Sequence, residues 1–369
     1  MKMLHLLKKS YYILKLKIML IVRSRMKLNK AEEILNNFYP KDFPNFSQNN
    51  NINRICDLMI IVPVYNVECY LEECILSLLN QKTKYDYQIV FVNDGSTDSS
   101  FSILKLYKND SRIKIINQSN KGLSAARNRA LEEITGKYVM FVDSDDYLAN
   151  DAVEKLLNMA YKNDADVVES EIICFANNVI TQTISHGKSG RLENSNELFG
   201  FACGKVIRAE KLKNFCFPEN FKFEDTVMGT LLHPTCARVY GLEENLYYYR
   251  QNPEGITATS KKSRSCVDTF YLTKYCLKES VQRRGAPSYD EYRRYLKKCR
   301  LNYIRTIDAP DDVKESIFIL TSQLFEEFFG GYSLKNNVAV DDRIYLLEKV
   351  IRKRSYKAFV WLMDCWDFI

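Results

Sequence analysis

Between residues 58 and 169 the sequence alternates short apolar runs with longer stretches of helical periodicity, and this alternation restricts the fold more than any other feature of the chain. The predicted strands are residues 58–62, 88–92, 113–116, 138–142 and 166–169, and the predicted helices are residues 70–81, 99–108, 124–134 and 151–163. Apolar strands that alternate with helices of about 10 to 15 residues form right-handed βαβ units. We therefore predict an α/β domain in which helices flank a mainly parallel sheet.

Polar residues gather directly after the predicted strands. In open α/β sheets, ligands bind outside the carboxyl ends of the strands. Here the first four strands are followed by residues 63–66, 93–96, 117–122 and 143–146. The sequence therefore places a ligand site at the edge of the sheet where these four segments meet.

The sharpest of these segments is Asp143-Ser144-Asp145-Asp146, which brings three carboxylates to the end of an apolar strand. Carboxylates so close repel one another unless a cation or the amides of a turn compensate their charge. Oxygen ligands favour Mg²⁺ or Mn²⁺ over zinc. The segment is therefore a candidate site for such a cation, bridged to phosphate oxygens. The alternative is a capping cluster before the helix that begins at Asp151.

The segments after the first two strands suit a nucleoside. Pro63 and Tyr65 place a rigid turn and an aromatic face where a flat base can stack. Glu68 lies just beyond them and is a candidate ligand of a ribose. Asp94 is an acceptor suited to an N–H on a base edge, and its alternative role is that of a turn or cap residue.

The segment around residue 121 suits a diphosphate. Lys121 and Arg127 lie at the predicted start of a helix, whose N-terminus favours negative charge. The alternative is an ordinary helix start with solvated cations. No G-x-G-x-x-G follows the first strand, and Gly187-Lys188-Ser189 lacks the upstream glycine of a P-loop, so neither of these phosphate motifs is present.

In their order and spacing, these segments resemble those of glycosyltransferase family 2, whose members have the GT-A fold. The resemblance covers residues 58–255. The matching motifs are Val62-Pro63-Val64-Tyr65-Asn66, Val92-Asn93-Asp94-Gly95-Ser96-Thr97-Asp98, Lys121-Gly122 with Ala126-Arg127-Asn128, Asp143-Ser144-Asp145 and Phe223-Glu224-Asp225.

The resemblance implies a role for each matching residue. Asp225 would be the general base that deprotonates the acceptor hydroxyl, with Glu224 beside it shaping the site. Asp145 would ligate the metal ion, Mn²⁺ or Mg²⁺, and Asp143 would contact both the ribose and the metal. The donor-binding residues would be Pro63, Tyr65, Glu68, Asp94, Lys121, Arg127, Asp143, Ser144, Lys205 and Arg250.

The activity implied is the inverting, metal-dependent transfer of one hexose. The expected donor is a UDP-sugar, and the expected acceptor is a saccharide or lipid-linked saccharide in capsule, exopolysaccharide or cell-wall glycan assembly. No Q-x-x-R-W motif follows the catalytic region, which favours single transfer over processive synthesis. The alternative is a non-catalytic subunit that binds a nucleotide-sugar within a glycosyltransferase complex. A nicotinamide dehydrogenase is disfavoured because the glycine fingerprint is missing.

The positive charge of the chain is concentrated at its N-terminus. Residues 1–30 carry seven Lys, two Arg and no acid, which is +9 against +7 for the whole chain, so the remaining residues sum to −2. The apolar run 11–22 is too short to span a membrane and is interrupted by lysines. On a helix, Leu7, Tyr11, Leu14, Ile18 and Ile21 form one face, and Lys8, Lys9, Lys15, Arg23 and Lys27 lie mostly on the other.

This pattern predicts a helix that lies in the interface of an anionic membrane. The enzyme would then be cytoplasmic and peripheral on the inner face of the cell membrane. The alternative is a helix docked on the body of the protein with a solvated basic face. Nucleic-acid binding is not indicated, because no nucleic-acid-binding module accompanies the charge.

The predicted organisation has three parts. Residues 1–55 form the basic segment and a linker. The linker is predicted over residues 36–55, because they are rich in Asn and Pro and lack periodicity. Residues 56–260 form the GT-A catalytic domain. Residues 261–369 form a C-terminal helical region, with helices at 266–284, 289–307, 313–329 and 341–366.

Overall fold

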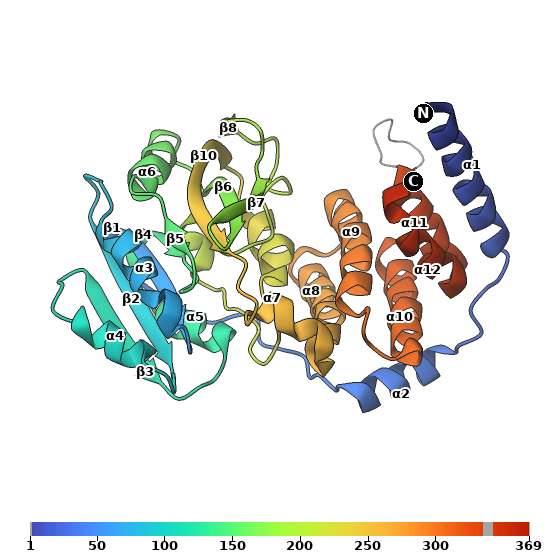
Figure 1. Cartoon of the computed structure of the whole chain (residues 1–369), viewed down its shortest axis with the longest axis horizontal. Helices are drawn as coiled ribbons and strands as arrows, with labels where there is room; N and C mark the ends of the chain where they lie inside the picture. The colour runs from blue at the N-terminus through green and yellow to red at the C-terminus, as the bar shows by residue number, and fades with distance from the viewer. Residues whose placement is uncertain (1, 335–341, 369) are drawn as a thin grey trace. The chain divides into compact units, whose positions relative to one another are not determined.

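The structure is a computed structural model of the chain that describes residues 2–334 and 342–368; for residues 2–10, 257, 261 and 368 only the backbone is described. The contacts within the chain divide it into two compact units (Figure 1). One unit runs from Pro44 to Gly255, and the other joins the segment up to Phe43 with the segment from Ile256 onward. The basic N-terminal segment therefore belongs to the same unit as the C-terminal helices.

The unit from Pro44 to Gly255 is built on one sheet. The order of its main strands is β3-β2-β1-β4-β9-β6-β10-β5, with β7 paired to β6 and β8 paired to β10. The strands are β1 (Asn51–Val64), β2 (Tyr87–Asp94), β3 (Ile113–Gln118), β4 (Glu133–Phe141), β5 (Tyr147–Leu148), β6 (Val167–Ala176), β7 (Val179–Ile184), β8 (Gly190–Arg191), β9 (Lys205–Arg208) and β10 (Val239–Arg250).

Strands β3, β2, β1 and β4 are mutually parallel, and β6 is parallel to β10. The predicted mainly parallel α/β sheet is confirmed, and its carboxyl ends form one edge. Strand β9 is antiparallel to both β4 and β6, between which it lies. It was not predicted, because a strand of four residues carries too little alternation to be recognised.

The helices of this unit are α3 (Glu68–Leu79), α4 (Ser100–Leu106), α5 (Leu123–Leu131) and α6 (Ala152–Lys162). The prediction that a helix continues to residue 134 is wrong, because Glu133 and Ile134 begin β4. These two residues pair with Asn51 and Ile52. For the same reason the predicted linker 36–55 is wrong at its C-terminal end, where residues 51–55 already belong to β1. It is wrong at its start as well, where helix α2 continues to Phe38.

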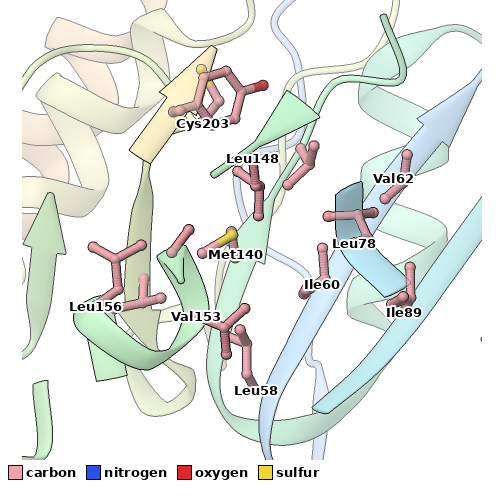
Figure 2. Packing of buried hydrophobic residues seen from close by; sticks show 14 of the residues in the cluster. Leu58, Ile60, Val62, Leu78, Ile89, Met140, Leu148, Val153, Leu156 and Cys203 are labelled. Carbon is pink, nitrogen blue, oxygen red and sulfur yellow. The ribbon is translucent and has the colours of Figure 1, made fainter. Parts of the chain in front are cut away.

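The core of this unit fixes the edge where the strands end. Figure 2 shows Leu58, Ile60 and Val62 of β1 projecting into one cluster with side chains from β2, β4, α3 and α6. Every residue of β1 from Leu58 to Val64 is buried, apolar and shielded on both faces, as expected for a parallel strand covered by helices. Close packing of this kind leaves the strand ends little freedom to move.

Asp166, directly before β6, offers a test of how pH affects stability. Its carboxylate accepts hydrogen bonds from the backbone N–H groups of Ala237 (2.8 Å) and Arg238 (3.1 Å). Burial alone would raise the pKa of Asp166, but these donors and the charges of Lys211 and Arg238 lower it. A lowered pKa in the folded state stabilises the protein above the unfolded-state pKa, and this stabilisation is lost as the pH falls through the folded-state value.

We therefore expect Asp166→Asn to lower the free energy of unfolding at pH 7 by about 1–2 kcal/mol, because a charged acceptor is lost. The difference from wild type should shrink in acid, once the carboxyl group of the wild type is protonated. Urea unfolding of both proteins at pH 7 and pH 3.5 measures this difference in the free energy of unfolding. The exposed neighbour Asp164, changed to Asn, is the control with a smaller effect. An equal loss at both pH values for Asp166→Asn would contradict the assignment.

The second unit is helical. Its helices are α1 (Lys2–Met19), α2 (Leu28–Phe38), α7 (Ile256–Thr259), α8 (Asp268–Arg284), α9 (Tyr289–Arg305), α10 (Asp311–Phe329), α11 (Asp342–Lys353) and α12 (Tyr356–Asp364). The prediction of one helix over 341–366 is wrong, and residue 341 itself lies outside the described residues. Arg354 has a φ of 51°, which ends α11, and the hydroxyl of Ser355 accepts a hydrogen bond from Ala358 N–H to cap α12.

Helix α1 lies against α12 within this unit. The hydroxyl of Ser355 donates to the carbonyl of Met19 (2.9 Å), and the ammonium of Lys15 lies 3.9 Å from the ring centroid of Trp361. Leu16 is fully buried. The side chains of Leu7, Lys8 and Lys9, which belong to the predicted amphipathic pattern, lie outside the described residues. Within the described part of the chain, every helix is too short or too polar to cross a bilayer.

Candidate active site

The metal loop, as we name residues 143–146 after β4 for the cation predicted there, is held in place by β10. The carboxylate of Asp146, which is buried, accepts hydrogen bonds from the hydroxyl of Tyr247 (2.6 Å) and the backbone N–H of Arg250 (2.7 Å). The same Tyr247 hydroxyl accepts from Asp143 N–H (3.1 Å). Asp146 was predicted as one of three carboxylates of a candidate cation segment; it is instead paired with Tyr247 and Arg250, and nothing local in the sequence shows that residues 247–250 return to this loop.

Asp145 is the next carboxylate of this loop. Its Oδ2 accepts a hydrogen bond from the side-chain amide of Asn252 (3.1 Å). Burial, together with the charge of Asp143, raises the pKa of Asp145, and burial with both neighbouring aspartates raises that of Asp146 well above its usual range. The negative charges of the carboxylates in this loop therefore repel one another.

A divalent cation would relieve this repulsion. Asp143 is partly exposed and Asp145 lies beside it in the loop, so their carboxylates are the available oxygen ligands. Among the residues that the structure describes, no third His, Cys, Asp or Glu joins them in a metal-binding arrangement. Two carboxylates nevertheless fit Mg²⁺ or Mn²⁺, since such ions usually complete their shell with substrate phosphates and water.

Arg250 was predicted to bind the donor, and the structure shows it fastening the metal loop. Its Nε donates to the backbone carbonyl of Asp145 (2.8 Å), and its guanidinium forms an ion pair with Glu73. The guanidinium also lies over the rings of Tyr70 and Phe175.

Arg127 joins two acidic motifs that are far apart in the sequence. Its guanidinium is buried and donates to Asp143 Oδ1 (2.7 Å) and to Glu224 Oε1 (2.5 Å). Burial alone would lower the pKa of Arg127. The charges of Asp143 and Glu224 outweigh this effect and raise the pKa above its usual value, so the side chain stays charged. Arg127 was predicted to bind a diphosphate; the structure shows it connecting Asp143 to Glu224, the neighbour of the predicted base Asp225.

Glu224 and Asp225 follow a strained turn. Phe223 is buried and has a φ of 62°, which is rare for a bulky residue and is often found at functional sites. Glu224 points inward to Arg127, and burial together with the charge of Asp225 raises its pKa, while Arg127 lowers it. Asp225 is partly exposed. It is therefore the member of the pair that an incoming molecule can reach.

Asp94 lies at the end of β2 and is buried. Its Oδ1 accepts hydrogen bonds from Gln118 Nε2 (2.8 Å) and Lys121 N–H (2.9 Å), and its Oδ2 accepts from Gly122 N–H (2.7 Å). An ionised carboxylate has about four acceptor positions. The three hydrogen bonds thus leave one position on Oδ2 for a further donor. The backbone of Lys121 binds Asp94, while its side chain is exposed.

The other predicted nucleoside residues surround this edge. Tyr65 follows β1 and is 48% exposed, which leaves room for a flat ring to stack. Pro63 lies in β1 opposite Val92. Glu68 Oε2 accepts from Ser99 N–H (2.7 Å), which fastens the start of α3 to that of α4. Ser144 is buried in the metal loop.

Lys205 is not part of this group. Its side chain is fully buried, pairs with Glu169 on β6 and donates to the carbonyl of Phe199 (2.7 Å). Lys205 was predicted to bind the donor from the family resemblance, and the register that sets it opposite Glu169 is not visible in the sequence. The structure therefore brings Asp143, Arg127 and Glu224 into direct contact, and it pairs Lys205 with Glu169 instead.

Comparison with solved structures identifies the fold. Staphylococcus aureus TarS (residues 1–349, in complex with UDP-GlcNAc) matches with a TM-score of 0.67 and 18% sequence identity, covering 84% of this chain and 91% of that one. The mainly parallel sheet, with the acidic loop after β4, therefore has the GT-A fold, and a helical region follows it.

The sequence comparisons identify the family. The model of glycosyl transferase family 2 matches residues 59–214. The uncharacterized glycosyltransferase YibD of Escherichia coli is 41% identical over 339 residues, which is 86% of this chain and 94% of YibD. The chain belongs to glycosyltransferase family 2.

Other relatives match over shorter stretches. The uncharacterized glycosyltransferase EpsJ of Bacillus subtilis is 36% identical over 217 residues, which is 54% of this chain and 62% of EpsJ. In two further curated relatives, the matched region makes up only 33% and 26% of the relative's own length.

Proposed function

We propose that this glycosyltransferase transfers a single hexose, with inversion, from a UDP-sugar to a saccharide or lipid-linked saccharide in capsule, exopolysaccharide or cell-wall glycan assembly. The observation that carries the proposal is the buried Arg127, which ties the metal loop at Asp143 to the Glu224–Asp225 pair. A site that only bound a nucleotide-sugar would have no need for a partly exposed carboxylate, Asp225, next to a residue that is anchored to the metal loop through Arg127.

Each residue then has a defined task. Mn²⁺ or Mg²⁺, held by Asp145 and Asp143, would neutralise charge on the departing nucleotide diphosphate. Asp225 takes the proton from the acceptor hydroxyl as its oxygen attacks the anomeric carbon from the face opposite the leaving group. Glu224 stays paired with Arg127 and keeps Asp225 in place. Inversion follows from a single displacement.

A uridine donor is supported by two features. Asp94 keeps one acceptor position open, which matches the single ring N–H of uracil, and Tyr65 offers a face for stacking. TarS, which shares the fold, was solved with UDP-GlcNAc.

A thermal-shift panel of UDP-, GDP- and dTDP-sugars with Mn²⁺, followed by an assay for free sugar, tests the proposal. We expect UDP-sugars to raise the melting temperature most, and the donor to be slowly hydrolysed without an acceptor. A larger shift with GDP-sugars or dTDP-sugars would overturn the choice of nucleotide. Binding without hydrolysis or transfer would indicate the alternative, a non-catalytic subunit.

Attachment to a membrane is also part of the proposal. Tyr11, Leu14, Ile18, Ile21 and Val22 form an exposed stripe on and just after α1, with exposed fractions between 52% and 82%. Leu16, on the opposite side of the helix, is buried, and Tyr12 and Lys15 contact Trp361 from the flank, so the docking leaves the stripe exposed. We propose that the stripe enters the interface of an anionic bilayer at the cytoplasmic face, assisted by the nearby Lys and Arg residues.

We expect Ile18→Glu combined with Ile21→Glu to reduce co-sedimentation with phosphatidylglycerol-containing vesicles by about tenfold or more, since two apolar side chains would no longer be buried in the bilayer. Turnover on a soluble acceptor should remain. Ile307→Glu, at a half-exposed apolar position of the same unit, is the matched control. Full retention of the double variant on vesicles would place the attachment elsewhere.

A further inference from the structure

A buried ionic cluster outside the proposed catalytic machinery closes a long loop. Glu169 on β6 is fully buried, and three points of the segment 186–205 converge on its carboxylate. His186 Nε2 lies 2.7 Å from Oε2, Phe199 N–H donates to Oε2 (2.9 Å), and the ammonium of Lys205 pairs with Oε1. The ring of His186 stacks on that of Phe199 at 4.3 Å.

Stability alone does not explain such a cluster. Removing charged groups from water is unfavourable, and a buried ion pair is often no more stable than apolar side chains of the same size. What the cluster does provide is a single position for the end of the loop. Lys205 also donates to the carbonyl of Phe199, and Ser170 N–H donates to the carbonyl of Gly204 (2.9 Å), so residues 199–205 are tied to β6 at both ends.

The tied segment runs to the end of β4. Cys203 pairs with Phe141, the last residue of β4, two positions before Asp143. This pairing sets Cys203 beside the strand end that leads into the metal loop. Figure 2 includes Cys203 among the packed side chains of the core.

Phe201 has the exposed aromatic side chain of this segment. Ala202 and Cys203 are buried, whereas Phe201 is 38% exposed. Because two residues span at most about 7 Å, its Cα lies within that distance of the Cα of Cys203. An aromatic ring is thus presented to solvent beside the carboxyl end of β4.

The strand order indicates which substrate this ring faces. The proposed nucleoside residues follow β1 and β2 on one side of β4, and residues 199–204 lead into β9 on the other side. A nucleotide-sugar bound at the first side and at the loop after β4 leaves the β9 side for the acceptor.

Resting on the proposed function, we propose that Phe201 is a stacking surface for the acceptor sugar, and that Glu169 with Lys205 is a positioning pair for it. The apolar C–H face of a pyranose matches an aromatic ring, which offers contact area with little loss of side-chain freedom. The substrate class is a saccharide acceptor with a free hydroxyl that lies beyond the stacked ring, toward Asp225.

Steady-state kinetics with p-nitrophenyl glycosides as soluble acceptors test the first part. We expect Phe201→Ala to raise the acceptor KM about tenfold while the donor KM changes by less than about twofold, and Phe201→Trp to restore the wild-type acceptor KM. Leu106→Ala, an exposed apolar position on α4, is the control. An unchanged acceptor KM in Phe201→Ala, or a raised donor KM of similar size, would overturn the proposal. Wild-type protein that neither transfers nor hydrolyses a donor would instead overturn the proposed function.

A double-mutant cycle tests the positioning pair. Glu169→Gln alone leaves a buried lysine charge and can unfold the protein, so the double variant Glu169→Gln with Lys205→Met removes both charges. We expect it to raise the acceptor KM and not the donor KM, and to add nothing further when combined with Phe201→Ala, because both changes act through the same ring. Independent, additive effects on the acceptor KM would contradict the positioning role.

Discussion

Asp225→Asn is expected to lower turnover by about 10²- to 10⁴-fold, since the acceptor hydroxyl loses the group that takes its proton. Asn keeps the size of the side chain and cannot act as a base at neutral pH. The donor should still bind, because the groups proposed to hold it lie at Asp94, Asp143 and Asp145. Single-turnover kinetics give the rate, and calorimetry with UDP and Mn²⁺ gives the affinity.

The control for this prediction is Asp98, just before α4, and Glu224, the neighbour of Asp225, gives a second comparison. Asp98→Asn changes a carboxylate that accepts from Ser100 N–H and Glu68 N–H, so it should leave turnover within a few-fold of wild type. Glu224→Gln should lower turnover by weakening the anchor to Arg127, and it should lower stability as well, which Asp225→Asn should not. Wild-type turnover in Asp225→Asn would remove Asp225 from the role of base.

Asp145→Ala is expected to lower the affinity for a UDP-sugar in Mn²⁺ by about 100-fold or more, to the level seen in EDTA. The physical reason is that two protein carboxylates serve the proposed cation, so one deletion leaves too few charged oxygens to hold it. Calorimetry with and without Mn²⁺ measures the affinity for the donor. Electron paramagnetic resonance of free Mn²⁺ measures how much of the metal the protein binds.

Asp86→Ala, at an exposed position before β2, is the matched control and should keep the full Mn²⁺ dependence. Asp146→Asn is an informative companion, since Asp146 faces Tyr247 and Arg250: it should disturb the loop without removing a ligand. If Asp145→Ala bound the donor with wild-type affinity in Mn²⁺, the metal assignment would be wrong.

Much of the sheet and its active edge could be predicted, because both depend on local pattern. Strands β1, β2, β3, β4 and β6 were recognised from apolar runs, and the acidic loop lies where the edge rule placed it. The short strands β5 and β8, and the exposed β7, carry no apolar alternation and were missed. The helix break at Arg354 was missed because no Gly or Pro marks it.

The partners of the charged residues could not be predicted. Arg127 has an ordinary place at a helix start, yet its two acceptors lie 16 and 97 residues away in the sequence. Lys205 occupies a matching position of the family pattern, yet its neighbour across the sheet is Glu169. In both cases the sequence shows a positively charged side chain, and only the packing of the strands shows which carboxylates surround it.

The sequence by itself determined the fold class, the family, the edge of the sheet that carries the site and the carboxylates expected there, because hydrophobic periodicity and motif spacing are properties of short segments. The tertiary structure decided that Arg127 is a buried strut, that Asp94 keeps a single acceptor position open, that Lys205 belongs to the Glu169 cluster and that the stripe on α1 is exposed. These depend on register and burial, which bring together residues distant in the chain and remove their charges from water.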